Sequence, residues 1–121
     1  MKGQGFLRRF GYARAGIVTA IRRERSMRTH GAAVIAVGIF LSLTGAPALW
    51  WALVGLAVGL VLVAEMANTA IETLADHLHP GQHPEIGVVK DVAAGAVRVA
   101  SVVAVIVGLA YLATLLPAMR A

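Results

Sequence analysis

The sequence feature that most constrains the fold is a long stretch without charge: residues 31–64 contain no Asp, Glu, Lys or Arg. A single helix of that length would extend about 50 Å, whereas the apolar core of a bilayer is only about 30 Å thick. Gly45 and Pro47 interrupt the stretch, and glycine ends helices as readily as proline begins them. The stretch therefore predicts two membrane spans joined by a tight turn, the first at about 29–44 and the second from 47.

Composition supports a membrane protein. Of the 121 residues 59% are hydrophobic and 14% are charged, and the mean hydropathy is +0.78. A soluble domain usually carries about 25% charged residues. The absence of cysteine excludes disulfides, thiolate metal sites and thiol nucleophiles. No apolar core precedes residue 31, so we expect no cleavable signal peptide.

Positive charge is concentrated ahead of the apolar stretch, and by the positive-inside rule this end lies in the cytoplasm. Eight of the eleven Lys and Arg residues are found there: Lys2, Arg8, Arg9, Arg14, Arg22, Arg23, Arg25 and Arg28. The sequence pI near 10.8 would suit a nucleic-acid binder, but aromatic residues are sparse and no DNA- or RNA-binding motif occurs. Anionic lipid headgroups are the better partner for this basic segment.

The remaining pattern predicts an all-α membrane protein with a single domain over 1–121. Phe6, Phe10 and Ile17 lie on one face of a helix over about 5–27, placed either on the inner membrane surface or against the protein's own cytoplasmic side. The second helix continues over 47–77, a loop rich in His, Pro and Gly follows, and a third spanning helix covers 85–116. Three small spans bury little apolar surface, so we expect self-association.

Three carboxylates and an amide form one stripe on the second spanning helix. Glu65, Asn68, Glu72 and Asp76 follow at steps of three, four and four residues. Ionised groups in lipid are costly, so the stripe must face protein or water. It could bind divalent cations, relay protons, or form a polar seam closed by Lys90 or Arg98. A small transporter or channel subunit is the alternative from another class, but such a path needs polar groups across the whole bilayer, and these cluster at one end.

Lys90 and Asp91 open the third spanning helix, where a lysine can neutralise phosphate and an aspartate can orient phosphate or a ribose. The alternative is an interface pair whose lysine extends toward water. His77 and His79 could chelate zinc, but no second well-spaced pair supports such a site. No P-loop, GxSxG or HExxH motif occurs.

These segments resemble a known family, the small prokaryotic integral-membrane diacylglycerol kinases and undecaprenol kinases. Residues 65–72, EMANTAIE, are similar to its motif E-x-x-N-[ST]-A-I-E, and residues 90–97, KDVAAGAV, to KD-x-[AG]-[AS]-[AG]-AV. Residues 10–17 resemble the family's entry helix, and Glu24, Arg28 and His30 fit E-x-x-x-R-x-[HE].

The resemblance implies a lipid kinase in the bacterial cytoplasmic membrane, using ATP and Mg²⁺ and built as a homotrimer with composite sites at subunit boundaries. It implies that Glu65 is the base that takes the proton of the lipid hydroxyl, that Asn68 positions the reacting groups, and that Glu24 and Glu72 hold the metal. The residues that it implies contact the nucleotide are Tyr12, Gly81, Gln82, His83, Lys90 and Asp91.

Small differences between the two branches of the family concern the acceptor. Thr69, Pro84 and residues 93–95 look more like the undecaprenol kinase branch, so undecaprenol is the favoured acceptor and diacylglycerol the alternative. The amino-acid sequence of the His/Pro/Gly loop differs from those usual in the family. The chain also departs from the family at Arg98, where an apolar residue is more usual.

Overall fold

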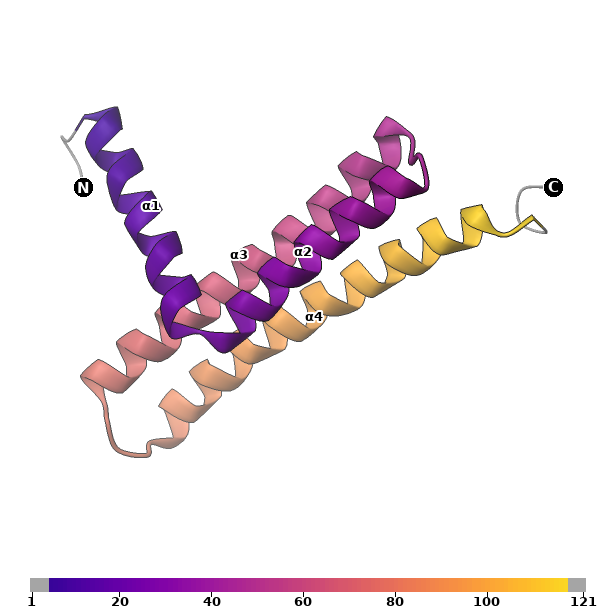
Figure 1. Cartoon of the computed structure of the whole chain (residues 1–121). Helices are drawn as coiled ribbons and strands as arrows, with labels where there is room; N and C mark the ends of the chain where they lie inside the picture. Colours follow the sequence, from indigo (N-terminus) through magenta and orange to yellow (C-terminus); the bar gives the residue numbers. More distant parts are fainter. Residues whose placement is uncertain (1–4, 118–121) are drawn as a thin grey trace.

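The computed structural model describes residues 5–117, which form four helices: α1 (Phe6–Arg23), α2 (Arg25–Leu43), α3 (Ala48–Leu78) and α4 (Pro84–Leu115). The helices α2, α3 and α4 run along one another, and α1 leaves them at a steep angle (Figure 1). By length and composition α2, α3 and α4 can each cross a membrane. The predicted all-α class with three spans and one additional helix is therefore confirmed.

The junction between α1 and α2 differs from the expected bounds of 5–27 and 29–44, because α1 ends at Arg23 and α2 already begins at Arg25. The Arg28 Nη1 atom donates to the carbonyl oxygens of Ile21 and Arg22, each at 2.9 Å, and so caps the end of α1. Between the two helices Glu24 is extended, with φ −108° and ψ 117°. The polar residues after Glu24 therefore form the first turn of α2, and Glu24 lies at a corner.

The other two connections lie within a residue of the expected positions. Gly45 adopts φ +66°, the left-handed conformation that favours glycine, and its amide donates to the Ser42 carbonyl at 3.2 Å. After Pro47, α3 runs over Ala48–Leu78, against the expected 47–77. Next to the second loop, the ring of His83 accepts a hydrogen bond from the Glu85 amide at 3.1 Å and caps α4.

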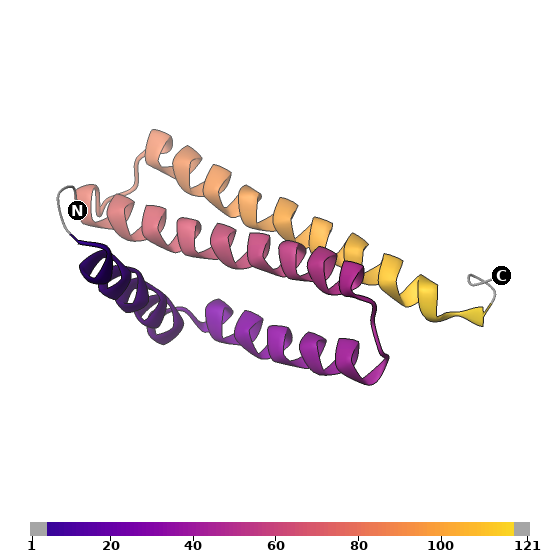
Figure 2. The same cartoon turned by 90° about the horizontal axis from the view of Figure 1, so that it is seen from above.

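The helices pack most closely between α3 and α4, which lie side by side over most of their lengths, while α2 packs along α3 (Figure 2). A small core holds the end that contains the α2–α3 turn, formed by Leu41, Val54 and Tyr111 with Trp50 against it. Tyr111 also shares a hydrogen bond with Thr44. Most large apolar side chains on the helices are exposed to the surroundings, as is expected of surfaces that lipid or further protein covers.

Candidate active site

The acidic stripe on α3 runs from a buried to an exposed end. Glu65 is 8% exposed, Asn68 and Glu72 are half-buried, and Asp76 near the second loop is exposed. From Glu65 to Asp76 the stripe rises about 16 Å along the helix. The innermost carboxylate is thus shielded, while the outer ones lie toward the polar end of the bundle.

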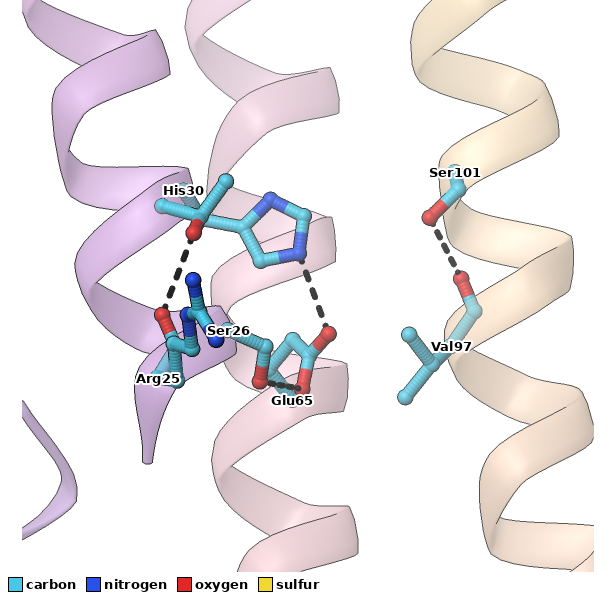
Figure 3. Close-up of polar contacts among 7 residues, drawn as sticks. Arg25, Ser26, His30, Glu65, Val97 and Ser101 are labelled. Carbon is cyan, nitrogen blue, oxygen red and sulfur yellow. Dashed lines mark hydrogen bonds and ion pairs between the residues drawn. The ribbon is translucent and has the colours of Figure 1, made fainter. Parts of the chain in front are cut away.

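Two side chains of α2 hold the Glu65 carboxylate (Figure 3). The Nε2 atom of His30 lies 3.0 Å from Oε1, and the Ser26 hydroxyl donates to Oε2 at 3.2 Å. An ionised carboxylate only accepts hydrogen bonds, so with Glu65 ionised the His30 N–H is the donor. Because each oxygen has its own donor, the orientation of the carboxylate is fixed.

Sequence reasoning missed this role of Ser26 and His30. The signal that was available is their spacing of four residues, which places both on one face of α2. Their partner, however, lies 35 or more residues further along the chain, so only the packing of α2 on α3 identifies it.

An open cavity of about 360 Å³ lies between α3 and α4 beside this carboxylate. It is lined by Glu65, Asn68, Ala94, Val97, Arg98 and Ser101. Among the described residues the Asn68 Oδ1 atom is buried and has no hydrogen-bond partner. A buried acceptor without a donor costs about 1–3 kcal/mol, so a ligand or water is expected to supply one. The structure thus brings the two predicted catalytic residues together and adds Arg98.

Lys90 and the second loop form another cavity, of about 610 Å³. It is lined by Pro80, Gly81, Gln82, His83, Pro84, Ile86, Gly87 and Lys90. Four of the six predicted nucleotide residues therefore meet at one place. Tyr12 on α1 and Asp91 on α4 are exposed and do not line it. The Lys90 ammonium forms an ion pair with Asp76, so α3 and α4 do share a polar seam at this end.

The two predicted metal ligands lie on different elements of the chain. Glu24 lies at the α1–α2 corner and Glu72 lies on α3; both are half-buried, and within residues 5–117 neither carboxylate has a hydrogen bond or ion pair. In that part of the chain, no three His, Cys, Asp or Glu side chains are close enough to hold a metal ion, and this applies to His77 and His79 as well. The free carboxylates suit Mg²⁺, which takes one or two of them and completes its shell with water and phosphate oxygens.

An apolar groove of about 430 Å³ leads to the site along α2, α3 and α4. On α2 its lining extends from His30 to Leu41, about 16 Å along the helix, and on α4 it extends to Leu112. His30 therefore contributes to the groove and also bonds to Glu65. One end of the apolar groove is thus lined by the residue that holds the carboxylate.

A buried, oriented carboxylate at the polar end of an apolar groove, on helices that can cross a membrane, defines a class of protein: a membrane enzyme that acts on the polar group of a lipid. Within that class the chain belongs to the prokaryotic diacylglycerol kinase family, whose model matches residues 11–112. It is therefore a lipid kinase that uses ATP, and the transporter or channel alternative does not hold.

Three relatives define the similarity further. An undecaprenol kinase of Bacillus subtilis (strain 168) is 38% identical over 104 residues, which are 86% of this chain and 85% of that protein. A diacylglycerol kinase of Synechocystis sp. is 41% identical over 101 residues, 82% of this chain and 57% of that protein. A diacylglycerol kinase of Escherichia coli (strain K12) is 32% identical over 96 residues, 79% of each chain. The relatives thus carry both acceptor names.

Proposed function

We propose that this chain is an undecaprenol kinase that transfers the γ-phosphoryl group of ATP to the lipid hydroxyl at the cytoplasmic face of the membrane. The observation that carries the proposal is the Glu65 carboxylate, 8% exposed and bonded on both oxygens, at the polar end of an apolar groove. Diacylglycerol is the alternative acceptor, because relatives of that name match over similar lengths of this chain.

Glu65 acts as the general base. Phosphoryl transfer leaves the protein little covalent work, so positioning of the hydroxyl and removal of its proton account for most of what the side chains do. Ser26 and His30 hold the carboxylate from α2, and the open side faces the cavity that contains Asn68. Asn68, with its buried oxygen unpartnered among the described residues, positions the reacting groups there.

The nucleotide binds at the second loop. Gly81, Gln82 and His83 line the cavity with Lys90, whose charge moves from Asp76 to the phosphates of ATP when the nucleotide binds. Asp91 lies one residue beyond Lys90, and Tyr12 lies on the exposed surface of α1. These two complete the nucleotide contacts from outside the cavity.

Glu24 and Glu72 provide the carboxylates for Mg²⁺, which when bound neutralises the ATP phosphates. In keeping with the composite sites that the resemblance to the family implies, we place this site between subunits of a homotrimer. The exposed apolar side chains of α2, α3 and α4 support such an assembly, since a single copy leaves them without protein contacts. The basic α1 and the loop cavity then lie on the cytoplasmic side, where ATP is found.

The shape of the groove favours a single hydrocarbon chain. It runs from His30, the residue that bonds to Glu65, toward Leu112, and we assign it to the one long isoprenoid chain of undecaprenol rather than to the two acyl chains of diacylglycerol. Ala94 lines the cavity beside Glu65, so a small side chain leaves room next to the base. The identities do not separate the two acceptors, since they are 38% to the undecaprenol kinase of Bacillus subtilis and 41% to the diacylglycerol kinase of Synechocystis sp..

A competition experiment tests the acceptor. The purified protein receives labelled ATP in detergent micelles with undecaprenol and a diacylglycerol at equal mole fraction, and both products are separated. We expect undecaprenyl phosphate to predominate, with no labelled lipid from the Glu65→Gln variant. A dominant phosphatidic acid product would reverse the ranking of the two acceptors.

A further inference from the structure

Arg98 has no electrostatic partner in the described part of the chain. It lies in the apolar part of α4, and no hydrogen bond or ion pair forms to it among residues 5–117. Lys90, two turns earlier on the same helix, has Asp76 as its partner. A guanidinium close to the apolar part of a bilayer is costly without an anion, so its location calls for one.

The position of Arg98 is level with that of the proposed base. Arg98 lies about 21 Å from the start of α4 at Pro84, and Glu65 lies about 20 Å from the end of α3 at Leu78. Both line the same cavity of about 360 Å³. A single water needs only about 10–15 Å³ by the same measure, so the cavity has room for a larger polar group.

During phosphoryl transfer Glu65 loses its negative charge and the lipid gains a charged phosphate. The lipid oxygen forms a bond to the γ-phosphorus, the bond from that phosphorus to the β,γ-bridging oxygen breaks, ADP leaves, and the hydroxyl proton goes to Glu65. Glu65 thereby becomes neutral at the moment when the lipid acquires a phosphate. Among the side chains that line the cavity, the cation is Arg98.

We propose that Arg98 makes the α3–α4 cavity a binding site for the phosphate monoester of the lipid product. This inference rests on the proposed function, because it takes Glu65 as the base. The guanidinium presents paired N–H donors that match phosphate oxygens, and such charged hydrogen bonds are stronger than neutral ones. Before ATP binds, Glu65 supplies the negative charge in the cavity, and after transfer, with Glu65 protonated, the phosphate of the product supplies it.

A binding measurement tests the site without catalysis. The probe is dodecyl phosphate in neutral detergent, with dodecanol and the diester didodecyl phosphate as comparison ligands, and affinity is followed by calorimetry. We expect Arg98→Gln to weaken binding of dodecyl phosphate about ten- to a hundredfold, the value of a charged hydrogen-bond pair. Arg98→Lys should retain part of the affinity. Arg14→Gln, the same charge change on α1 at a residue that does not line the cavity, should leave it unchanged.

The Glu65→Gln variant tests the charge exchange. It resembles the protonated base, so it should bind dodecyl phosphate several-fold more tightly than the unaltered protein, and Arg98→Gln in the same chain should remove that gain. Equal affinity of the unaltered and Arg98→Gln proteins, with Arg98→Lys also unchanged, would overturn the proposal.

Three further outcomes concern a headgroup anchor, the identity of the acceptor, and the exchange of charge. Equal loss of the diester and the monoester would make Arg98 an anchor for bilayer headgroups and would also overturn the proposal. A product of phosphatidic acid in the competition experiment would correct the acceptor alone, because both acceptors give a phosphate monoester. Absence of any tightening in Glu65→Gln would reject the exchange of charge between Glu65 and the product.

Discussion

The imidazole Nε2 atom of His30 lies 3.0 Å from the Oε1 atom of Glu65, and this contact joins α2 to α3 at the innermost carboxylate. His30 lies two turns after the corner at Glu24, and Ser26 lies within the first of those turns. The segment that follows the corner between α1 and α2, the first of the helices that can cross a membrane, therefore also orients the proposed base.

Two replacements of His30 should show whether its hydrogen bond to Glu65, rather than its volume, is what activity requires. Glutamine retains an N–H donor of similar reach, so we expect His30→Gln to keep most of kcat. His30→Leu keeps an apolar volume but no donor, and kcat should fall about ten- to a hundredfold with little change in KM for ATP, because a charged hydrogen bond is lost. Equal activity of His30→Leu and the unaltered protein would reject this positioning role.

Glu65→Gln should abolish phosphoryl transfer while nucleotide affinity stays within a few fold. The amide preserves volume and hydrogen bonding but does not accept the proton, and a general base contributes about 10² to 10⁴ in rate. Single-turnover transfer and ATP-analogue binding, measured on the same preparation, check both parts. Near-normal turnover would exclude Glu65 as the base.

Glu24→Gln and Glu72→Gln should each raise the Mg²⁺ concentration that gives half the maximal rate. Each removes one of the few protein ligands that Mg²⁺ accepts. Glu85→Gln is the matched control. Glu85 is exposed in the first turn of α4, and we assign it no part in binding Mg²⁺. If the titrations of both variants coincide with that of the control, the metal assignment is wrong.

Mixed oligomers should regain activity that neither parent has. In an assembly of Glu24→Ala and Glu65→Ala chains, some subunit boundaries combine an intact Glu24 with an intact Glu65, provided that the two come from different protomers. Activity of differently tagged, co-purified assemblies measures this. Continued inactivity after verified mixing would favour sites contained within one chain.

Gly108→Leu should narrow the apolar groove on its α4 side. A Cβ at Gly108 meets no atom within 4 Å, so the larger side chain extends into the groove without displacing backbone. We expect a several-fold higher KM for a long polyprenol and little change for a short-chain alcohol. Gly38→Leu is the control, at a glycine of α2 that is equally free of close neighbours but does not line the groove. If both variants raise the KM for the long polyprenol equally, or if neither variant raises it, the assignment of the groove is wrong.

Much of the fold could be predicted from local signals. The uncharged stretch, the left-handed Gly45 and Pro47 placed the first turn, and the Pro- and Gly-rich loop placed the second. The end of α1 could not be predicted in the same way. It depends on Arg28, a residue of the next helix, whose side chain folds back onto the carbonyls of Ile21 and Arg22.

The candidate site also combines features that local sequence predicts with features that depend on how the helices pack. The spacing of Glu65 and Asn68 placed both on one face of α3, and the structure finds both in one cavity. The donors Ser26 and His30 depend on how α2 slides along α3, and the level of Arg98 depends on how the second loop sets α4 against α3. Neither register is encoded in the periodicity of a single helix.

The sparse packing between helices affects how many substitutions such a sequence can tolerate. Few side chains fill the space between helices, with Leu41, Val54 and Tyr111 as the main core, and most apolar residues face outward. An exchange of one aliphatic residue for another on such a face leaves no cavity and breaks no contact within the chain. Identities of only 32% to 41% to relatives agree with such tolerance. Mutational tolerance should be lowest at the few polar side chains that cross from one helix to the next.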